Sequence, residues 1–320
     1  MATVLVTDYD YPDLSIERAV LADTGVDLRE TQAETTAELI DAIEAHDADA
    51  LLNQHVSVGR AVFEAHPDLR AVGRYGIGVD TIDLDAATEH RVYALNVPEY
   101  CLDEVPTHAM ALLLSVERRT AMYTAQIRDG TWEWTQGQPM YRLRGRTLGL
   151  VGFGTLPRNL VPKADAFGLD LIAYDPYVDE ETMTDAGVES VTFDEVLERS
   201  DIVSVHAPLT DETRNLFDSE AFESMDDQAI LINTSRGAVI DVDALHDAIE
   251  ANELRGAGID VMPDEPPEHH PLFDLDSVVL TPHVAWYSEQ SIVELRRTIT
   301  EDVLRVLQGA KPENPINELD

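Results

Sequence analysis

The chain is constrained most by a strand–turn–helix–strand pattern near its middle. A short apolar run over residues 147–151 is followed at once by Gly152 and Gly154, which flank one phenylalanine. Such a run predicts a buried parallel strand, and the glycines let the backbone turn sharply and approach a ligand closely. A helix is expected over 156–167, and a second apolar run follows over 169–174. This layout predicts the dinucleotide-binding unit of an α/β domain, although a glycine pair also occurs in many tight turns that bind nothing.

Single residues of this unit predict how a dinucleotide would bind. Thr155 and Leu156, at the expected helix start, would offer unpaired N–H groups and a positive dipole to a pyrophosphate. Asp175 would accept hydrogen bonds from the adenosine ribose, and its charge disfavours the 2′-phosphate of NADP, so NAD is the predicted cofactor. Pro157 stands where the pattern usually has a third small residue. We expect Pro157 to displace the helix start slightly and Arg158 to help hold the pyrophosphate.

The charge of the chain restricts its partners. The 320 residues suffice for two domains with a core each, and 62 acidic residues against 22 basic ones give a formal net charge of −40. Such a surface either binds a cationic partner or, as we favour, is halophilic, with molar salt screening its self-repulsion. DNA or RNA binding is disfavoured because no basic stripe is present.

The cysteine count and the apolar stretches indicate in which cellular compartment the protein is expected. Cys101 is the only cysteine, which excludes an intrachain disulfide and a cysteine metal cluster. The first residues lack the basic and apolar regions of a signal peptide, and the strongest apolar stretch, 109–116, is too short to span a bilayer. We therefore expect a cytoplasmic protein without a membrane partner.

Short apolar runs alternate with helical patterns along the chain, which predicts parallel sheets covered by helices on both faces. Strands are expected at 3–7, 50–53, 69–73, 91–96, 202–205, 229–233, 256–261 and 277–280. Helices are expected at 14–21, 37–45, 103–119, 193–199, 220–225, 241–252 (with Asp241 as cap) and 288–308 (with Ser288 as cap).

Two features are open to more than one interpretation. The helix over 103–119 is apolar on nearly every face, so we expect it between domains or at a subunit interface. Trp132, Trp134 and Tyr141 lie in a region of weak pattern. They form either an interface arm or a loop anchored to the body of the domain.

Polar residues end every expected strand of the second half of the chain. They are Asp175, His206, Thr234 to Arg236, Asp260 and Thr281 to His283. Ligands of doubly wound sheets bind at the carboxyl ends of the strands, so these residues are expected to converge on one site.

Two of these residues, together with Glu265 from a Pro-rich loop, suit hydride transfer from a 2-hydroxy acid. Arg236 could pair bidentately with a carboxylate, His283 could exchange a proton, and Glu265 could stabilise the imidazolium. Taken singly, Arg236 could be a surface ion pair and His283 a core histidine. The adjacent His269 and His270 are expected to be exposed to solvent rather than to bind a metal.

These motifs, in this order, resemble those of the NAD-dependent, D-isomer-specific 2-hydroxyacid dehydrogenases over essentially the whole chain. The matching segments are 73–83, the dinucleotide unit, 206–210, 233–237, 258–261, 265–266 and 281–283. The resemblance implies two doubly wound parallel-sheet domains, a flavodoxin-like substrate domain over 1–97 plus 290–320 and a Rossmann NAD domain over 98–289. It also implies a homodimer built in part by the helix over 103–119.

Carried over position by position, the resemblance implies a set of site residues. The catalytic residues would be Arg236, Glu265 and His283. The NAD site would be formed by Gly152, Gly154, Thr155, Leu156, Asp175, His206, Ala207, Pro208, Thr234, Ser235 and Asp260, without a metal. The substrate, a small 2-hydroxy or 2-oxo acid, would contact Arg74, Ile77, Gly78 and Trp286.

Within the family, residues 283–290 are most similar to the C-terminal binding proteins, NADH-responsive corepressors that keep a dehydrogenase site. If Trp286 lines the substrate pocket, as this similarity implies, it would favour a substrate with an apolar side chain. The alternative is that Trp286 only packs against the rest of the protein. Two functions therefore remain open. The chain is either an enzyme that interconverts a D-2-hydroxy acid and its 2-oxoacid, or an NADH-sensing binding protein whose turnover is incidental.

Overall fold

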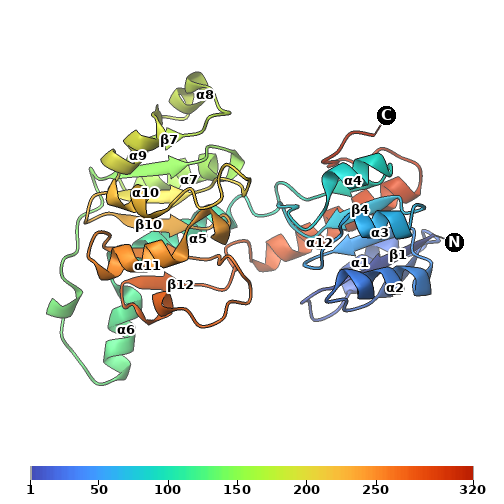
Figure 1. Ribbon diagram of the computed structural model, residues 1–320, viewed down its shortest axis with the longest axis horizontal. Coiled ribbons are helices and arrows are strands. Elements are labelled where there is room, and N and C mark those ends of the chain that lie inside the picture. The colour runs from blue at the N-terminus through green and yellow to red at the C-terminus, as the bar shows by residue number, and fades with distance from the viewer. Residues whose placement is uncertain (1, 320) are drawn as a thin grey trace. The chain divides into compact units, whose positions relative to one another are not determined.

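The computed structural model describes residues 2–319 and divides the chain into two compact units. Unit 1 comprises Met1–Tyr100 and Ser288–Asp320, and unit 2 comprises Cys101–Tyr287 (Figure 1). Each unit contains one sheet in which every strand pairing is parallel. Because parallel neighbours need crossover connections, helices separate most of the strands, and this confirms the predicted α/β class with two parallel-sheet domains.

Unit 1 is built on a five-stranded sheet of order β2-β1-β3-β4-β5. Its strands are β1 (Thr3–Val6), β2 (Asp27–Glu30), β3 (Ala50–Asn53), β4 (Ala71–Arg74) and β5 (Tyr93–Leu95). Its helices are α1 (Ser15–Leu21), α2 (Thr36–His46), α3 (Arg60–Ala65), α4 (Leu84–Glu89) and α12 (Glu289–Leu307). A Cβ added to Gly73 would lie 2.8 Å from side-chain atoms of Ile299 and Val303, so the glycine lets α12 pack closely on β4.

Unit 2 is built on a seven-stranded sheet of order β12-β11-β10-β9-β6-β7-β8. Its strands are β6 (Thr147–Val151), β7 (Asp170–Tyr174), β8 (Glu189–Ser190), β9 (Ile202–Val205), β10 (Ile230–Asn233), β11 (Gly256–Ile259) and β12 (Val278–Leu280). The order reverses direction at β6, which lies between β7 and β9. In doubly wound sheets this switch point is where ligands bind, at the carboxyl ends of the strands.

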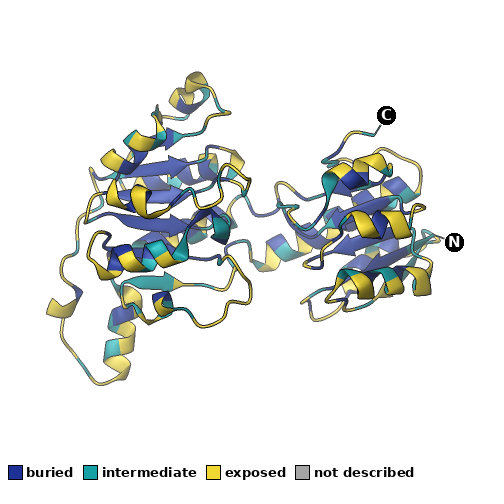
Figure 2. Cartoon of the chain, viewed as in Figure 1, coloured by how far each residue is buried: buried dark blue, intermediate teal, exposed yellow. Residues whose placement is uncertain are grey.

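The helices of unit 2 comprise seven α-helices and three short 3₁₀ turns within the described residues. They are α5 (Glu104–Glu117), α6 (Thr120–Arg128), α7 (Thr155–Ala166), α8 (Glu180–Asp185), α9 (Phe193–Arg199), α10 (Ser219–Glu223), α11 (Val242–Glu250), η1 (Thr135–Gly137), η2 (Gly237–Val239) and η3 (Pro271–Asp274). The strands β9, β10 and β11 are buried over their whole length, whereas most helices expose one face (Figure 2). This is the burial expected of a sheet with covered faces.

The structure refines several expectations about single elements. Asp241 and Ser288 do cap α11 and α12 through side-chain hydrogen bonds, as predicted. The apolar helix α5, expected between domains or at a subunit interface, packs within unit 2 on β10, β11, β12 and α7. Gly258 allows this close packing, because a Cβ there would lie 2.9 Å from the Cβ of Leu112. The elements β2, β8, α3, α4, α6 and α8 were not expected.

Candidate functional site

The turn after β6 has the backbone geometry that its glycines suggested. Gly152 has a φ of +94°, a conformation that favours glycine, and its N–H donates to the carbonyl of Tyr174 at 2.8 Å. A Cβ on Gly152 would lie 2.9 Å from backbone atoms of both His206 and Ala207. The first glycine therefore lets the turn lie directly against the carboxyl end of β9.

The helix that follows starts one residue earlier than expected, at Thr155, with Gly154 as its N-cap. Gly154 makes no side-chain cap, and a Cβ at this position would meet nothing within 4 Å. Pro157 is buried in the first turn of α7, where proline is tolerated because its missing N–H would have no intrahelical partner. The Nε of Arg158 donates to the carbonyl of Phe153 at 3.0 Å.

Asp175 directly follows β7 and accepts a hydrogen bond from the same turn. Its Oδ2 accepts the N–H of Phe153 at 2.8 Å, and its Oδ1 accepts the N–H of Tyr177 at 2.9 Å. Each carboxylate oxygen can accept a second hydrogen bond. Asp175 is thus fixed beside the glycine turn while it retains capacity for hydroxyl donors.

His206 ends β9, the neighbouring strand, and is followed by Ala207 and Pro208. The Nε2 of His206 lies 2.9 Å from the hydroxyl of Ser204. Desolvation by the surrounding protein lowers the pKa of His206 from 6.5 to about 4, which makes the ring neutral at neutral pH. A neutral ring here adds no positive charge beside the turn.

Asn233, the last residue of β10, stabilises the turn that follows this strand. Its side-chain oxygen accepts the N–H and hydroxyl of Ser235 at 2.9 and 2.8 Å, and its side-chain nitrogen donates to the carbonyl of Arg236 at 3.0 Å. Within this turn the hydroxyl of Thr234 is buried and has no hydrogen-bond partner among residues 2–319. A buried hydroxyl without a partner is costly, so it fits a ligand atom at this position.

Arg236 and Glu265 are brought together by close contact between two loops. A Cβ on Gly237 would overlap the backbone of Met262, at 1.9 Å from its carbonyl carbon, so only glycine fits there. The N–H of Met262 in turn donates to Oε1 of Glu265 at 2.9 Å. The loops after β10 and β11 therefore lie against one another.

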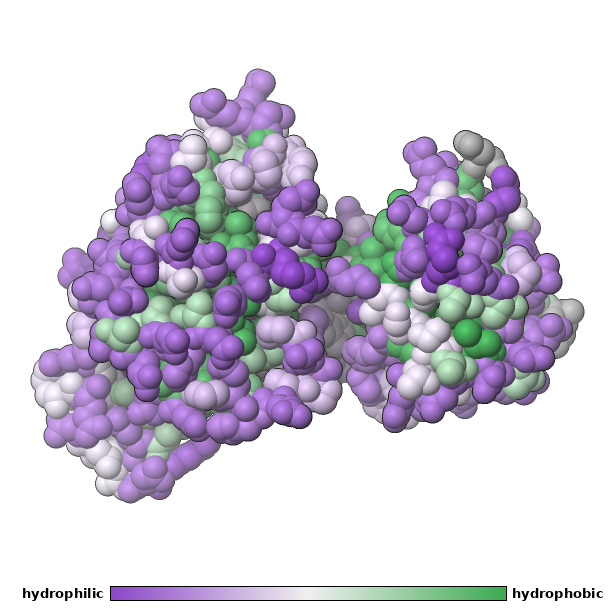
Figure 3. Space-filling view, in the orientation of Figure 1, coloured by the Kyte–Doolittle hydropathy of each residue, from purple (hydrophilic) through white to green (hydrophobic). Residues whose placement is uncertain are grey.

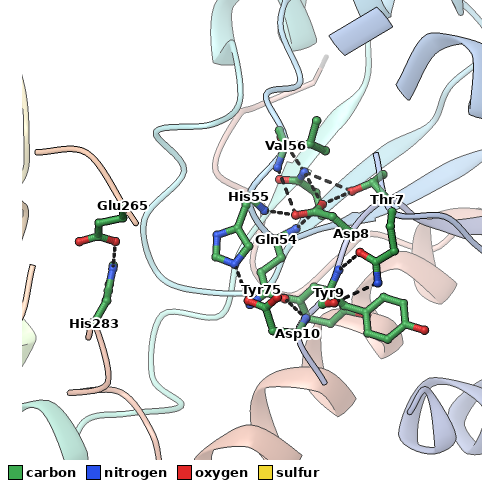
Figure 4. Close-up of polar contacts among 12 residues, drawn as sticks. Thr7, Asp8, Tyr9, Asp10, Gln54, His55, Val56, Tyr75, Glu265 and His283 are labelled. Atoms are coloured by element: carbon green, nitrogen blue, oxygen red, sulfur yellow. Dashed lines mark hydrogen bonds and ion pairs between the residues drawn. The ribbon is translucent and has the colours of Figure 1, made fainter. Parts of the chain in front are cut away.

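Glu265 and His283 form the central pair of unit 2. Oε2 of Glu265 lies 2.6 Å from Nδ1 of His283, and Figure 4 shows the ring nitrogen pointing at the carboxylate. Both side chains remain partly exposed, at 36% and 43%. An ionised carboxylate only accepts hydrogen bonds, so Nδ1 carries the proton and Nε2 is left to exchange one.

The charge of this pair is set by its neighbours. Burial alone raises the pKa of Glu265, but the hydrogen bond and charge of His283, the N–H of Met262 and the charge of Arg236 together hold this pKa below its usual value. Glu265 is therefore ionised throughout the neutral range. Arg236 and His283 therefore both lie close enough to Glu265 to influence its charge.

The turn that carries His283 has an unusual backbone. His283 has a φ of +51°, which is uncommon for a residue other than glycine, and its N–H donates to the carbonyl of Asp260 at 2.7 Å. The carboxylate of Asp260 is buried and accepts the N–H groups of Val284 and Ala285 at 2.9 and 3.0 Å. The Nε1 of Trp286 donates to the carbonyl of His283 at 2.9 Å and closes the turn.

The predicted substrate residues of unit 1 follow β4. The guanidinium of Arg74 donates to the carbonyl of Tyr75, and Gly76 has a φ of +155°. Beyond it, the carbonyl of Ile77 accepts the side chain of Asn96 at 2.7 Å. Gly78 continues the same loop, and nothing in unit 1 alone assigns it a ligand.

Sequence analysis missed a carboxylate network in unit 1. Asp8, just after β1, is buried and accepts the N–H groups of Gln54, His55 and Val56 at 3.1, 2.5 and 3.2 Å (Figure 4). The Nε2 of His55 lies 3.0 Å from a carboxylate oxygen of Asp10. Asp8 thus fixes the loop after β3. Asp8 follows a strand in the first half of the chain. Strand ends were considered as candidate sites only in the second half of the chain, so Asp8 was not selected.

One expectation about histidines was wrong. The side chain of His269 is 71% exposed, as expected, but that of His270 is only 18% exposed, because it pairs with Asp243 at 3.0 Å and accepts the N–H of Leu272. Among residues 2–319, no group of three or more His, Cys, Asp or Glu residues is placed to hold a metal ion. The same residues include no helix with the length and apolar character needed to cross a membrane.

Several features of unit 2 fit a bound dinucleotide. The first N–H groups of α7 lack intrahelical acceptors, and the position next to Gly154 is open. The buried hydroxyl of Thr234, which has no hydrogen-bond partner among residues 2–319, could bind a dinucleotide atom. The carboxylate of Asp175 can also accept further hydrogen bonds from a dinucleotide. These features belong to β6, β7 and β10, whose carboxyl ends share one edge of the sheet.

The family model for the NAD-binding domain of D-isomer specific 2-hydroxyacid dehydrogenases matches residues 110–285. The chain is 37% identical over 278 residues to a glyoxylate reductase of Korarchaeum cryptofilum, covering 85% of this chain and 83% of that protein. It is 34% identical over 319 residues to a D-3-phosphoglycerate dehydrogenase of Methanocaldococcus jannaschii, covering 99% of this chain. The chain spans only 60% of the length of that phosphoglycerate dehydrogenase.

Solved structures agree with this match. The TT0316 protein from Thermus thermophilus superposes with a TM-score of 0.89 at 31% identity, covering 98% of this chain and all of that one. The D-lactate dehydrogenase of Aquifex aeolicus, solved with NAD and lactic acid, superposes with a TM-score of 0.86 at 25% identity, covering 96% of each chain. The chain therefore belongs to the D-isomer-specific 2-hydroxyacid dehydrogenases, a family of NAD-binding oxidoreductases.

Proposed function

We propose that this protein is an NAD(H)-dependent enzyme that interconverts a D-2-hydroxy acid and its 2-oxoacid, with His283 as the acid/base. The observation that carries the proposal is the 2.6 Å contact between Nδ1 of His283 and the ionised carboxylate of Glu265. It fixes the ring and directs Nε2 to the proton that moves. The bound nicotinamide supplies or accepts the hydride.

Three side chains then have distinct roles in the reductive direction. Protonated His283 donates from Nε2 to the keto oxygen of the substrate, and Glu265 stabilises the imidazolium before transfer. The guanidinium of Arg236 binds the substrate carboxylate and polarises the keto group, since its planar fork matches both. In the oxidative direction neutral His283 takes the hydroxyl proton.

The remaining contacts follow from the strand ends. We assign the pyrophosphate to the N–H groups of Thr155 and Leu156 beside Gly152 and Gly154. The adenosine ribose is assigned to Asp175, and the nicotinamide end to Asp260. Further cofactor contacts are assigned to His206, Ala207, Pro208, Thr234 and Ser235. Unit 2 is accordingly the proposed NAD domain and unit 1 the proposed substrate domain, in which Arg74 and the N–H groups of Ile77 and Gly78 bind the substrate.

The side chain of the substrate is the least constrained part of the proposal. Trp286 is fixed next to His283 by its hydrogen bond to the carbonyl of that residue. An indole beside the acid/base favours a substrate that carries hydrogen or a small apolar side chain on C2. We therefore favour glyoxylate-like and pyruvate-like acids.

A homodimer is proposed on separate grounds. Trp132 and Trp134, in the segment after α6, are 87% and 67% exposed, and Ile127 of α6 is 51% exposed. Exposed aromatic side chains of this size favour a protein interface. Tyr141, by contrast, is anchored, because its hydroxyl donates to Gln228 and its ring covers Arg146 and Arg255. Light scattering in high salt tests the dimer, and Trp132→Ser/Trp134→Ser should yield monomers.

The enzyme proposal is tested by turnover with NADH on a panel of 2-oxoacids in high salt. The panel contains glyoxylate, pyruvate, hydroxypyruvate and 3-phosphohydroxypyruvate, and product chirality is measured on a chiral column. We expect rates of about one per second or above on at least one acid, with a D product and weak use of NADPH. NADH binding without turnover on any acid would instead favour an NADH-sensing binding protein.

A further inference from the structure

His108, on α5, lies in direct contact with the residues that hold the His283 turn. Its Nε2 is 2.9 Å from the hydroxyl of Thr281 and 3.5 Å from Oδ1 of Asp260. The side chain is 22% exposed, so most of the ring is enclosed by unit 2. Neither the motifs nor the proposed reaction uses this histidine.

The direction of each hydrogen bond can be worked out from the atoms present. The hydroxyl of Thr281 lies 2.6 Å from Oδ1 of Asp260, a carboxylate that already accepts two backbone N–H groups. A threonine hydroxyl has one hydrogen, and an ionised carboxylate has none to give. Thr281 therefore donates to Asp260 and accepts from His108, whose proton must lie on Nε2.

The same carboxylate controls the backbone at His283. Oδ1 and Oδ2 of Asp260 receive the N–H groups of Val284 and Ala285, while the carbonyl of Asp260 receives that of His283. His283 has a φ of +51°, a conformation that persists in a non-glycine residue only when its surroundings enforce it. The turn therefore depends on a correctly oriented Asp260 carboxylate.

We infer that His108 is a positioning residue for the acid/base. It orients the hydroxyl of Thr281, Thr281 orients the carboxylate of Asp260, and Asp260 holds the turn that aims the ring of His283. The inference rests on the proposed role of His283, and it adds a residue from α5 to the chain of contacts behind that role.

The test compares His108→Phe, which cannot donate a hydrogen bond, with His108→Gln, whose amide can still donate to Thr281. We expect His108→Phe to lower kcat by about tenfold, because small displacements of a catalytic group are costly. The kinetic isotope effect with NADH deuterated at the transferred hydrogen should rise, since the chemical step becomes slower. The melting temperature should stay near wild type, and His108→Gln should recover kcat to within about threefold.

The matched control is His246→Phe, which changes a similarly enclosed histidine of α11 that is paired with Asp247 at 3.0 Å. It should leave kcat and the isotope effect unchanged. Unchanged kcat in His108→Phe would overturn the inference. So would an equal loss in the Phe and Gln variants that follows a lower melting temperature, because that pattern indicates a purely structural role.

A second readout does not depend on turnover. The Nδ1 proton of His283, in its 2.6 Å contact with Glu265, should give a far-downfield NMR resonance that His283→Gln identifies by its loss. In His108→Phe this resonance should shift or broaden, and in His246→Phe it should not. An unchanged resonance would count against the positioning role. Absence of turnover in the wild type would count against the proposed function alone.

Discussion

At the residue scale, the two histidines at the ends of β9 and β12 have opposite partners. His206 contacts the hydroxyl of Ser204, whereas His283 contacts the carboxylate of Glu265. A hydroxyl does not stabilise an imidazolium as a carboxylate does. The two strand ends therefore fit the different tasks that we propose for them: His206 for neutral contact with a cofactor, and His283 for proton exchange.

The lowered pKa of His206 makes a testable difference to stability. In the unfolded chain this group takes up a proton near pH 6.5, but in the folded chain it does so only near pH 4. Its contribution to stability is therefore complete above pH 6.5 and is lost progressively as the pH falls toward 4. We expect the free energy of unfolding of His206→Gln to fall less steeply than that of the wild type over this range, by up to about 1.4 kcal/mol per pH unit.

Histidine ring NMR measures the titration directly. The His206 resonances should stay in the neutral form down to about pH 4. The exposed His269 serves as the control, because substitutions at β9 should leave its ring resonances unchanged. A His206 ring that titrates near pH 6.5 would contradict this account of its surroundings.

The sequence pointed to candidate residues at strand ends but not to those that support them. Arg236 and His283 were selected because polar side chains at the ends of parallel strands share one sheet edge, and Glu265 because a carboxylate could stabilise the imidazolium. His108 could not be selected this way, since it lies in the middle of an apolar helix. Its role depends on how α5 lies on the sheet, and that packing is set by contacts far apart in sequence.

At the element scale, the turn between β6 and α7 depends on two glycines for different reasons. Gly152 is needed for the backbone, because its φ is +94° and a Cβ would meet the backbone of β9's end at 2.9 Å. At Gly154 the fold does not require glycine, because a Cβ there meets nothing within 4 Å of the protein. The fold therefore requires glycine at position 152, whereas we expect glycine at position 154 to matter for ligand binding.

The two alanine variants should therefore differ. Gly152→Ala should lower the free energy of unfolding by about 1–3 kcal/mol or more, since a left-handed residue is strained and a contact is added. Gly154→Ala should cost less than about 1 kcal/mol, as expected at an N-cap, yet weaken NADH binding. Chemical denaturation and fluorescence titration with NADH measure the two effects. Equal stability losses, or unchanged NADH affinity in Gly154→Ala, would contradict the assignment.

Elements were predictable where the sequence pattern is continuous. The strands at 147–151 and 202–205 were placed with the observed bounds because each is a buried apolar run. β2 has the sequence Asp-Leu-Arg-Glu, and β8 has only two residues. Both are edge strands, and their polar composition provides no apolar run from which a strand could be predicted. α6 was missed because few of its residues are buried, so its pattern carries little periodicity.

At the scale of the whole molecule, charge dominates the surface. The view in Figure 3 is mostly hydrophilic, and the chain has a net charge of −40. Few of these charges are neutralised by basic residues, because only 22 are present. Mutual repulsion of this kind favours the expanded chain at low ionic strength.

We therefore expect stability to rise with salt. The screening length falls from about 10 Å at 0.1 M to about 3 Å at 1 M, so the midpoint of thermal unfolding should be higher in about 2 M KCl than in about 0.1 M KCl. Asp41→Asn/Glu44→Gln/Asp68→Asn, which removes three exposed carboxylates, should weaken this dependence. A midpoint independent of KCl would show that the acidic surface is not an adaptation to salt.

The proposed role of His283, held by Glu265, is to move the proton during reduction of a 2-oxoacid. The decisive measurement is kcat of His283→Gln, taken beside NADH affinity and beside the exposed control His269→Gln. We expect kcat of His283→Gln to fall by about 10²–10⁴-fold, the usual size of acid–base catalysis, with NADH affinity retained and the control unaffected. Turnover near the wild-type rate in His283→Gln would show that His283 does not move the proton.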